Sequence, residues 1–225
     1  VIATPRQLGN FAHNQGDEIR GLAQQFQETL NQQGIPLRIL PGADVRIEDG
    51  MLQKLASGEV LSLGDLGGHV LLELPHELYF PLEGILDALS SQGLIGILSH
   101  PERNRGILRD CDLLPSLVDA GCLMQVTAGS LMGTFGSASQ QLSEWMLSEG
   151  LVHFIATDAH GIRSRRPLMR RAFDRVAELT DQQTAEDLCV NYPALVARRE
   201  RVPAGRRSVR KASGWKSMFS RRQAS

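Results

Sequence analysis

The fold of this chain is constrained most by a regular alternation of short apolar runs with amphipathic helical patterns. The apolar runs span residues 1–4, 37–40, 70–74, 94–99, 122–127 and 152–157. The helical patterns between them span residues 17–33, 81–93, 112–121 and 140–150. The last three patterns each end on a glycine just before the next run, as helices commonly do. Because parallel strands covered by helices read as continuous apolar runs, the alternation predicts an α/β protein built on a parallel sheet.

Polar residues gather where the apolar runs end, and their positions bear on the kind of sheet. Five of the six runs contain, end on or lead into such a residue. These residues are Asp44, Glu73, His100, Thr127, Asp158 and His160. In a (β/α) barrel every carboxyl end opens on one mouth, whereas an open doubly wound sheet brings together only the strand ends beside its switch point. Both architectures fit the alternation, and the polar strand ends favour the barrel.

The composition is that of one soluble globular domain. The 225 residues are 42% hydrophobic and 22% charged, which is enough apolar material for a single core. The three cysteines form no C-x-x-C pair, which favours a reducing, cytoplasmic compartment. No apolar run approaches the roughly 20 residues that cross a bilayer. We therefore expect a cytoplasmic protein that is at most peripheral to a membrane.

Basic residues crowd the end of the chain. Between residues 198 and 222 a single glutamate opposes them, although the net charge of the whole chain is −1. We therefore expect a body over residues 1–197 and a basic, disordered tail over residues 198–225. The tail either solubilises the body or, with Trp215 and Phe219, contacts an anionic membrane or an acidic partner. Nucleic acid is not an expected partner, because nothing in the body supports it.

The polar strand ends suit a site for divalent cations. Taken singly, an aspartate after a strand is commonly a turn former or helix N-cap, and a histidine commonly packs in a wall. As a set, these residues supply the carboxylates and imidazoles that manganese, iron or zinc prefers, whereas calcium and magnesium favour oxygen alone. The candidate ligands are Asp44, Glu73, His100, Asp158 and His160. The histidines without a strand-end position, assigned to the surface or to packing, are His13, His69, His76 and His153.

Three longer strings carry a resemblance to a known family. They are LSHPERNR at 98–105, QVTAGSLMGTFG at 125–136 and FIATDAH at 154–160, preceded by LPGADVRI at 40–47 and LLELP at 71–75. In this order they resemble the bacterial PHP-type (polymerase and histidinol phosphatase) tyrosine phosphatases of capsule and exopolysaccharide operons. The resemblance implies a distorted, TIM-like (β/α) barrel of the PHP type with a three-metal site that prefers manganese. It also implies hydrolysis of phosphotyrosine on a partner tyrosine kinase, and a membrane-associated kinase would give the basic tail a purpose.

The resemblance assigns roles to residues of this chain. Those on metal-ligand positions of the family are Glu73, His100, Asp158 and His160. Asp44 falls where the family more usually has a glutamate. Arg103 and Arg165 fall on arginines that hold the substrate phosphate, which a planar guanidinium binds through paired hydrogen bonds. The resemblance implies a reaction that uses two or three divalent cations, manganese with iron or zinc as alternatives, and no thiol nucleophile. No C-x5-R string of the cysteine-based tyrosine phosphatases is present.

The chain departs from the family at its start. Family members open on a strand with an H-x-H ligand pair, so we expect a barrel that lacks its first strand here. Arg6 stands where the family has a histidine ligand, and a permanent cation there would repel a metal ion.

Two interpretations of these departures lead to different functions. The sequence is either a fragment of an active phosphatase, which we favour because it begins on Val1 and keeps the HPERN and DAH strings, or an inactive relic that acts as a binding or regulatory module. A third interpretation keeps the metal barrel but changes the substrate to histidinol phosphate or nucleic acid. The QVTAGS string favours the tyrosine phosphatases.

Overall fold

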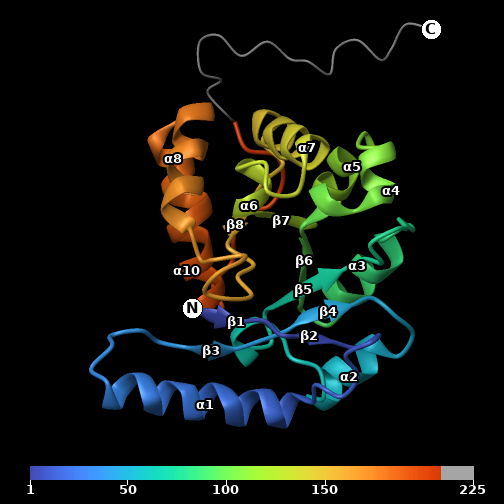
Figure 1. Ribbon diagram of the computed structural model, residues 1–225. Coiled ribbons are helices and arrows are strands. Elements are labelled where there is room, and N and C mark those ends of the chain that lie inside the picture. The colour runs from blue at the N-terminus through green and yellow to red at the C-terminus, as the bar shows by residue number, and fades with distance from the viewer. Residues whose placement is uncertain (209–225) are drawn as a thin grey trace, which may run out of the picture.

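Six parallel strands form the main sheet of the computed structural model, which describes residues 1–208 (Figure 1). In spatial order they are β2 (Arg6–Gln7), β4 (Asp44–Arg46), β5 (His69–Glu73), β6 (Ile95–Ser99), β7 (Leu123–Thr127) and β8 (Phe154–Ala156). A second, two-stranded parallel sheet pairs β1 (Ile2–Ala3) with β3 (Leu40–Pro41). The predicted α/β class with a parallel sheet is confirmed.

Helices connect successive strands of the main sheet. As the patterns that end on glycine predict, α3 (Glu83–Ser91) joins β5 to β6, α5 (Leu113–Asp119) lies between β6 and β7, and α7 (Ser137–Ser148) lies between β7 and β8. The other helices are α1 (Gly16–Gln32), α2 (Met51–Ser57), α4 (Arg105–Arg109), α6 (Ala128–Leu131), α8 (Met169–Leu179), α9 (Gln182–Glu186) and α10 (Tyr192–Ala197), with shorter helical segments η1 (Leu63–Asp65), η2 (Pro101–Arg103) and η3 (Asp187–Asn191). In the described part of the chain, no helix has the length and apolar character that spanning a membrane requires.

The segment around Gly42 differs from the prediction. We expect a strand over residues 37–40, but the chain forms two short strands, β3 and β4, on either side of Gly42. A Cβ atom at Gly42 would lie 2.8 Å from the side chain of Ile2, so only glycine allows the close approach at which the chain passes from the small sheet to the main sheet. Asp44 consequently begins β4, three residues after β3 ends.

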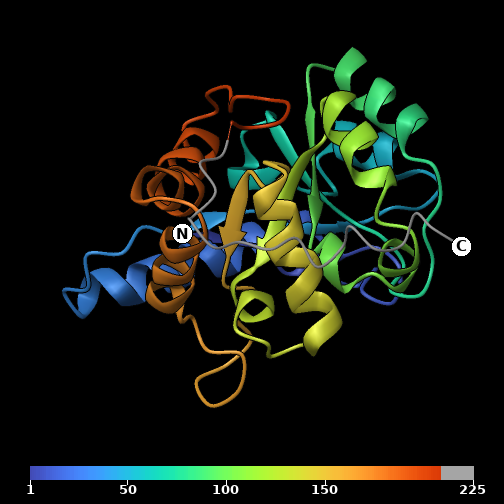
Figure 2. The same ribbon diagram turned by 90° about the horizontal axis from the view of Figure 1, so that it is seen from above.

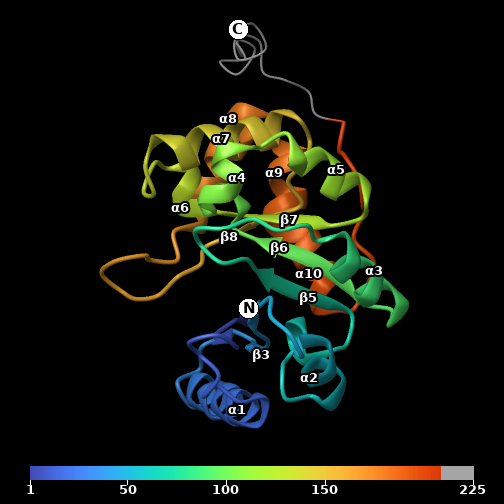
Figure 3. The same ribbon diagram turned by 90° about the vertical axis from the view of Figure 1, so that its right-hand side faces the viewer.

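The main sheet is curled and open. β2 and β8 each pair with one neighbour within residues 1–208, and β1 pairs with β3 and does not close the sheet. The sheet is therefore a curled half-barrel, where we predicted a distorted (β/α) barrel that lacks its first strand. In the view of Figure 3, α4, α5 and α7 lie above the sheet and α1 and α2 lie below it.

Alternation of side chains between the two faces of the strands separates the core from the polar strand ends. On the outer face, Leu72 and Leu98 belong to the large core that includes residues of α3, α5 and α7. The inner face holds a smaller apolar cluster with Leu71, Ile97, Leu123, Phe154 and Val196. Glu73 and Ser99 stand two residues beyond Leu71 and Ile97 and therefore lie on the inner face, at the carboxyl edge of the sheet.

The beginning of the predicted tail packs against the body. Val202 is only 5% exposed, and the guanidinium of Arg207 forms a 2.8 Å ion pair with Asp187. These contacts hold parts of the segment 198–208 against the body, although its low apolar content is typical of a disordered segment. The rest of the predicted tail, with Trp215 and Phe219, lies outside the described residues.

His153 anchors this segment through both of its ring nitrogens. The backbone N–H of Met124 donates to Nδ1 over 3.1 Å, so Nε2 carries the proton and donates to the carbonyl oxygen of Gly205 over 3.1 Å. The ring is fully buried, and this burial lowers the pKa of His153 from 6.5 to about 4. Of the two alternatives expected for His153, surface or packing, the structure shows a packed, buried side chain.

The protein should lose stability as the pH falls from 6.5 to about 4, because His153 binds a proton in this range in the unfolded chain but not in the folded chain. The two pKa values limit the loss in free energy of unfolding to about 3 kcal/mol. The variant His153→Gln should flatten the slope of unfolding free energy against pH in this range, measured by urea denaturation. His13→Gln, a matched change at an exposed site, should keep the wild-type slope, and an unchanged slope in His153→Gln would contradict the prediction.

Candidate metal centre and arginine pair

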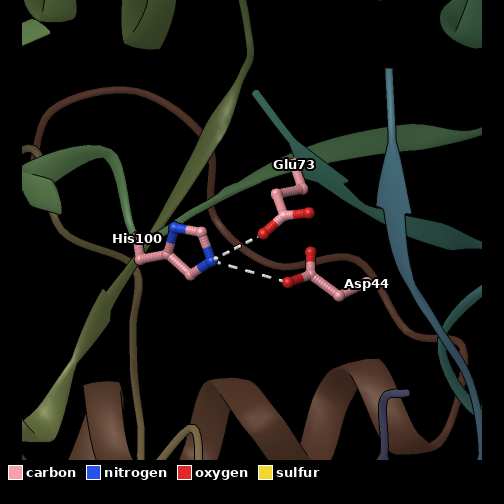
Figure 4. Close-up of side chains that lie close together, drawn as sticks. All are labelled: Asp44, Glu73 and His100. Atoms are coloured by element: carbon pink, nitrogen blue, oxygen red, sulfur yellow. Dashed lines mark ion pairs between the residues drawn. The ribbon is translucent and has the colours of Figure 1, made fainter. Parts of the chain in front are cut away.

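Three of the predicted ligands meet at the carboxyl edge of the sheet (Figure 4). Asp44 begins β4, Glu73 ends β5 and His100 follows β6, so three adjacent strands deliver these side chains. Nε2 of His100 lies 3.5 Å from Oδ2 of Asp44 and 3.6 Å from Oε1 of Glu73. One ligand atom from each residue lies within 4.8 Å of the others. We call these three residues the triad.

Burial and mutual contact set the protonation of the triad. Burial alone would lower the pKa of His100, but hydrogen bonds to Asp44 and Glu73 outweigh it and raise this pKa to about 9. Burial alone would raise the pKa of Glu73, but the hydrogen bond to His100 and the charges of nearby arginines hold it below its ordinary value. The imidazolium thus balances two nearly buried carboxylates.

The donor set of the triad fits a divalent metal ion. Two carboxylates with one imidazole suit manganese, iron or zinc, and a bound cation would balance the carboxylates as the imidazolium proton does. The hydroxyl of Ser99 donates to Oδ1 of Asp44 over 2.9 Å, while Oδ2 faces His100. Such an outer hydrogen bond orients a carboxylate toward a metal ion.

Arg6 lies beside the triad and forms an ion pair with Glu73. Its Nη2 atom is 2.7 Å from Oε1 of Glu73, and the parallel pairing of β2 with β4 sets Arg6 opposite Asp44. The Cζ atom of Arg6 lies 5.5 Å from the ring centre of Phe11. A permanent cation therefore occupies one side of the Glu73 carboxylate, and the effect of Arg6 on metal binding stays a prediction.

Asp158 and His160 do not join the triad. Nη1 of Arg103 donates to Oδ2 of Asp158 over 2.6 Å, and Nη2 of Arg165 donates to the same oxygen. The side chain of His160 is 49% exposed, and its Nδ1 atom lies 2.9 Å from the backbone oxygen of Asp158. The structure thus unites the two predicted phosphate-binding arginines around Asp158 and divides the five predicted ligands into the triad and a separate pair.

The HPERN string connects the site to neighbouring loops through residues that the sequence analysis did not single out. Oε1 of the fully buried Glu102 accepts hydrogen bonds from the N–H of Thr127 over 3.0 Å and from the hydroxyl of Ser130 over 2.6 Å. This contact joins HPERN to QVTAGS. Asn104 donates to the carbonyl oxygen of Pro75 over 2.6 Å, which joins HPERN to LLELP. Their place inside these strings is the sequence signal that could have identified them.

Three residues of the site adopt left-handed backbone conformations. The φ angles are 36° at His100, 46° at Asp158 and 48° at Arg165, and these are three of the six described non-glycine residues with positive φ. Side chains make such conformations unfavourable, so they persist only where surrounding contacts hold them, which is frequent at functional sites. The backbone of the site is therefore held by its surroundings.

A groove of about 360 Å³ opens beside the triad. Its lining includes the polar residues Glu73, His100 and Arg103 and the apolar residues Leu8, Phe11 and Leu74. This volume is in the range of small-molecule pockets. The combined lining suits a ligand that joins an anionic group to an apolar ring.

The fold and the site together define an α/β half-barrel protein with a candidate metal centre and an adjacent arginine pair. A family model described as capsular polysaccharide synthesis, CpsB/CapC, matches residues 1–198. The chain therefore belongs to the CpsB/CapC family, in agreement with its resemblance to the capsule-operon phosphatases.

Several similar proteins are named tyrosine-protein phosphatases. Tyrosine-protein phosphatase YwqE of Bacillus subtilis is 36% identical over 167 residues, which cover 73% of this chain but 65% of YwqE, slightly less than two thirds. Putative tyrosine-protein phosphatase CapC of Staphylococcus aureus is 30% identical over 175 residues, which cover 77% of this chain and 68% of CapC. A solved structure also matches this chain, with a TM-score of 0.86 at 31% identity. It comes from a study of YwqE from Bacillus subtilis and CpsB from Streptococcus pneumoniae, which are described there as unique metal-dependent tyrosine phosphatases. The match covers 94% of this chain and 85% of that chain.

Replacement of Arg6 should strengthen metal binding at the triad. Arg6→Gln removes the guanidinium that pairs with Glu73, so we expect a Kd for Mn²⁺ at least about tenfold lower, measured by isothermal titration calorimetry. Arg105→Gln, which breaks an exposed ion pair with Glu77, is the matched control and should leave the Kd unchanged. Weaker or unchanged metal binding in Arg6→Gln would show that Arg6 does not compete at this site.

Proposed function

We propose that this chain belongs to a metal-dependent protein-tyrosine phosphatase that removes phosphate from a partner protein in capsule or exopolysaccharide synthesis. The observation that carries the proposal is that two members of the carboxylate–histidine triad, Glu73 and His100, and one member of the arginine pair line the same groove. The names of the similar proteins support the substrate class. The sequence strings and the curled parallel sheet support assignment to the PHP type.

We infer that the site takes two or three divalent cations, with manganese preferred and iron or zinc as alternatives. Asp44, Glu73 and His100 would hold one ion, and Asp158 and His160 would contribute to another. Such ions, when bound, polarise phosphoryl oxygens and lower the pKa of a water ligand. The donor chemistry of the triad supports the first of these sites.

The arginine pair is proposed to hold the substrate phosphate. Arg103 and Arg165 both donate hydrogen bonds to one carboxylate oxygen of Asp158. A phosphate group has more acceptor oxygens than a carboxylate, so it could accept hydrogen bonds from both guanidiniums. The ring of Phe135 supports both guanidiniums, because the Cζ atoms of Arg103 and Arg165 lie 4.1 and 5.8 Å from its centre. Two positive charges fixed in this way would bind the phosphate and offset the charge that develops during its transfer.

The apolar side of the groove is proposed to hold the tyrosyl ring. Phe11 lies on this side and also stacks near Arg6. An aromatic wall favours an aryl phosphate over an alkyl phosphate, because ring contacts add to the burial of apolar surface.

We propose a membrane-associated tyrosine kinase as the phosphorylated partner and the cytoplasm as the compartment. The link of the family with capsular polysaccharide synthesis supports a partner in that process. The basic composition of residues 198–225 supports contact with an anionic membrane surface.

A second candidate function is a module that binds a phosphorylated partner without hydrolysing it. The 2.7 Å ion pair between Arg6 and Glu73 favours this candidate, because a cation at a ligand carboxylate weakens metal binding. Hydrolysis measurements separate the two functions directly.

The protein supplied with Mn²⁺ should release phosphate from a phosphotyrosyl peptide, and His100→Ala should reduce the rate to background because it removes one ligand of the triad. Histidinol phosphate and single-stranded DNA should react more slowly than the peptide. Asp174→Ala, an exposed change on α8, is the control and should retain the wild-type rate. Inactivity of the wild type on all three substrates would reject the phosphatase and favour the binding module.

The variant Phe11→Ala should raise KM for a phosphotyrosyl peptide by about fivefold, the value expected for one lost aromatic contact of about 1 kcal/mol. KM for a phosphoseryl peptide, which lacks a ring, should change little. Steady-state kinetics with the two peptides measure this difference. An equal rise in KM for both peptides would show that Phe11 does not contact the ring.

A further inference from the structure

A second hollow, of about 160 Å³, lies next to the arginine pair. One side is formed by residues from the end of β7 through α6 and the loop after it, and the other by residues between β8 and α8 and by the start of α8. In Figure 2 the orange loop that leads from β8 to α8 extends beside α6. The lining includes Thr127, Met132, Phe135, Leu168 and four arginines, Arg163, Arg165, Arg166 and Arg171. We call this hollow the basic pocket.

The basic pocket is connected to the groove through the arginine pair. Arg165 lines the basic pocket, and Arg103 lines the groove beside the triad. Both arginines donate to Oδ2 of Asp158. Arg103, Asp158 and Arg165 therefore connect the groove to the basic pocket. A ligand bound in the groove would lie next to the basic pocket.

The charge of the basic pocket is not balanced from within. Its lining contains no acidic residue, and Arg163, Arg166 and Arg171 form no ion pair with another residue in the range 1–208. On the same helix, by contrast, Arg170 pairs with Asp174 and Arg175 with Glu144. Guanidiniums gathered around a hollow repel one another and attract an anion.

We propose that the basic pocket binds a second anionic group of the substrate, a carboxylate or phosphate on a residue near the phosphotyrosine. This inference rests on the proposed function, because it places the phosphotyrosine in the groove. Consecutive residues of an extended peptide are about 3.3–3.6 Å apart, so a residue within a few positions reaches a neighbouring hollow. Met132 and Leu168 offer apolar contact to the stem of a long acidic side chain, and the arginines receive its charged end.

Peptides of equal length that carry a non-hydrolysable phosphonate analogue of phosphotyrosine test this proposal. One has neutral flanking residues, one has glutamates and one has phosphoserines. Fluorescence anisotropy with the Mn²⁺-loaded protein should show binding of the glutamate peptide about fivefold tighter than that of the neutral peptide, as expected for one exposed charge pair of about 1 kcal/mol. Salt raised to about 0.5 M should remove most of this preference.

The double variant Arg166→Gln/Arg171→Gln should lose the preference for acidic flanks and keep the affinity for the neutral peptide. Arg170→Gln is the matched control, because this arginine lies on α8 outside the pocket lining, and it should keep the preference. A phosphoserine peptide that binds tighter than the glutamate peptide would support the pocket with phosphate as its anion. Equal binding of all three peptides by the wild type, or a preference that survives in the double variant, would overturn the proposal.

Hydrolysis of the neutral phosphotyrosyl peptide tests the phosphatase activity separately from anion binding in the basic pocket. If this peptide is hydrolysed and acidic flanks give no advantage in binding, the phosphatase stands and the basic pocket fails. If no peptide is hydrolysed and the double variant still loses a measured binding preference, the pocket stands and the phosphatase fails.

Discussion

Two buried carboxylates that share one imidazole are the interaction on which the site depends. Asp44 and Glu73 are 7% and 6% exposed, and carboxylates at such positions are unfavourable unless a cation or hydrogen bonds compensate them. Nε2 of His100 lies within 3.6 Å of both. The cluster is possible because β4, β5 and β6 are adjacent and parallel, so that three chain segments distant in sequence reach one edge of the sheet.

Contacts around the triad hold it in place and connect it to the phosphate-binding side. Glu102 joins the loop after β6 to the loop after β7, so His100, Arg103 and the segment that carries Phe135 are held relative to one another. Phe135 in turn packs against Arg103 and Arg165. The candidate metal site, the arginine pair and the basic pocket therefore belong to one connected arrangement at the carboxyl edge of the half-barrel.

Much of the fold could be predicted from the sequence, because it depends on local patterns. The apolar runs that became β5, β6, β7 and β8, and the helices that end on glycine between them, are visible as periodicity and turn signals. The proximity of Glu73 and His100 follows from the shared carboxyl edge of adjacent parallel strands, whereas Asp44 begins β4 and reaches them through the pairing of β4 with β5. The two short strands on either side of Gly42 could not be predicted, because they depend on a close approach to Ile2.

Other features depend on partners that periodicity does not reveal. Nothing local indicates that Asp158 pairs with two arginines and stays apart from the triad, or that Arg6 pairs with Glu73. The segment 198–208 has the composition of a disordered tail, yet it contacts the body. Arg207 forms an ion pair with Asp187, and the carbonyl oxygen of Gly205 accepts a hydrogen bond from His153. Whether the sheet closes also depends on which strands pair. Because β1 pairs with β3, it does not close the main sheet.

The central claim, that the triad is a metal centre, is tested most directly by anomalous X-ray scattering from crystals of the protein grown with Mn²⁺. Data collected on both sides of the manganese absorption edge locate the ion without reference to activity. We expect a peak of anomalous density bounded by Asp44, Glu73 and His100. Crystals with manganese bound elsewhere and no anomalous density at these three side chains would contradict it.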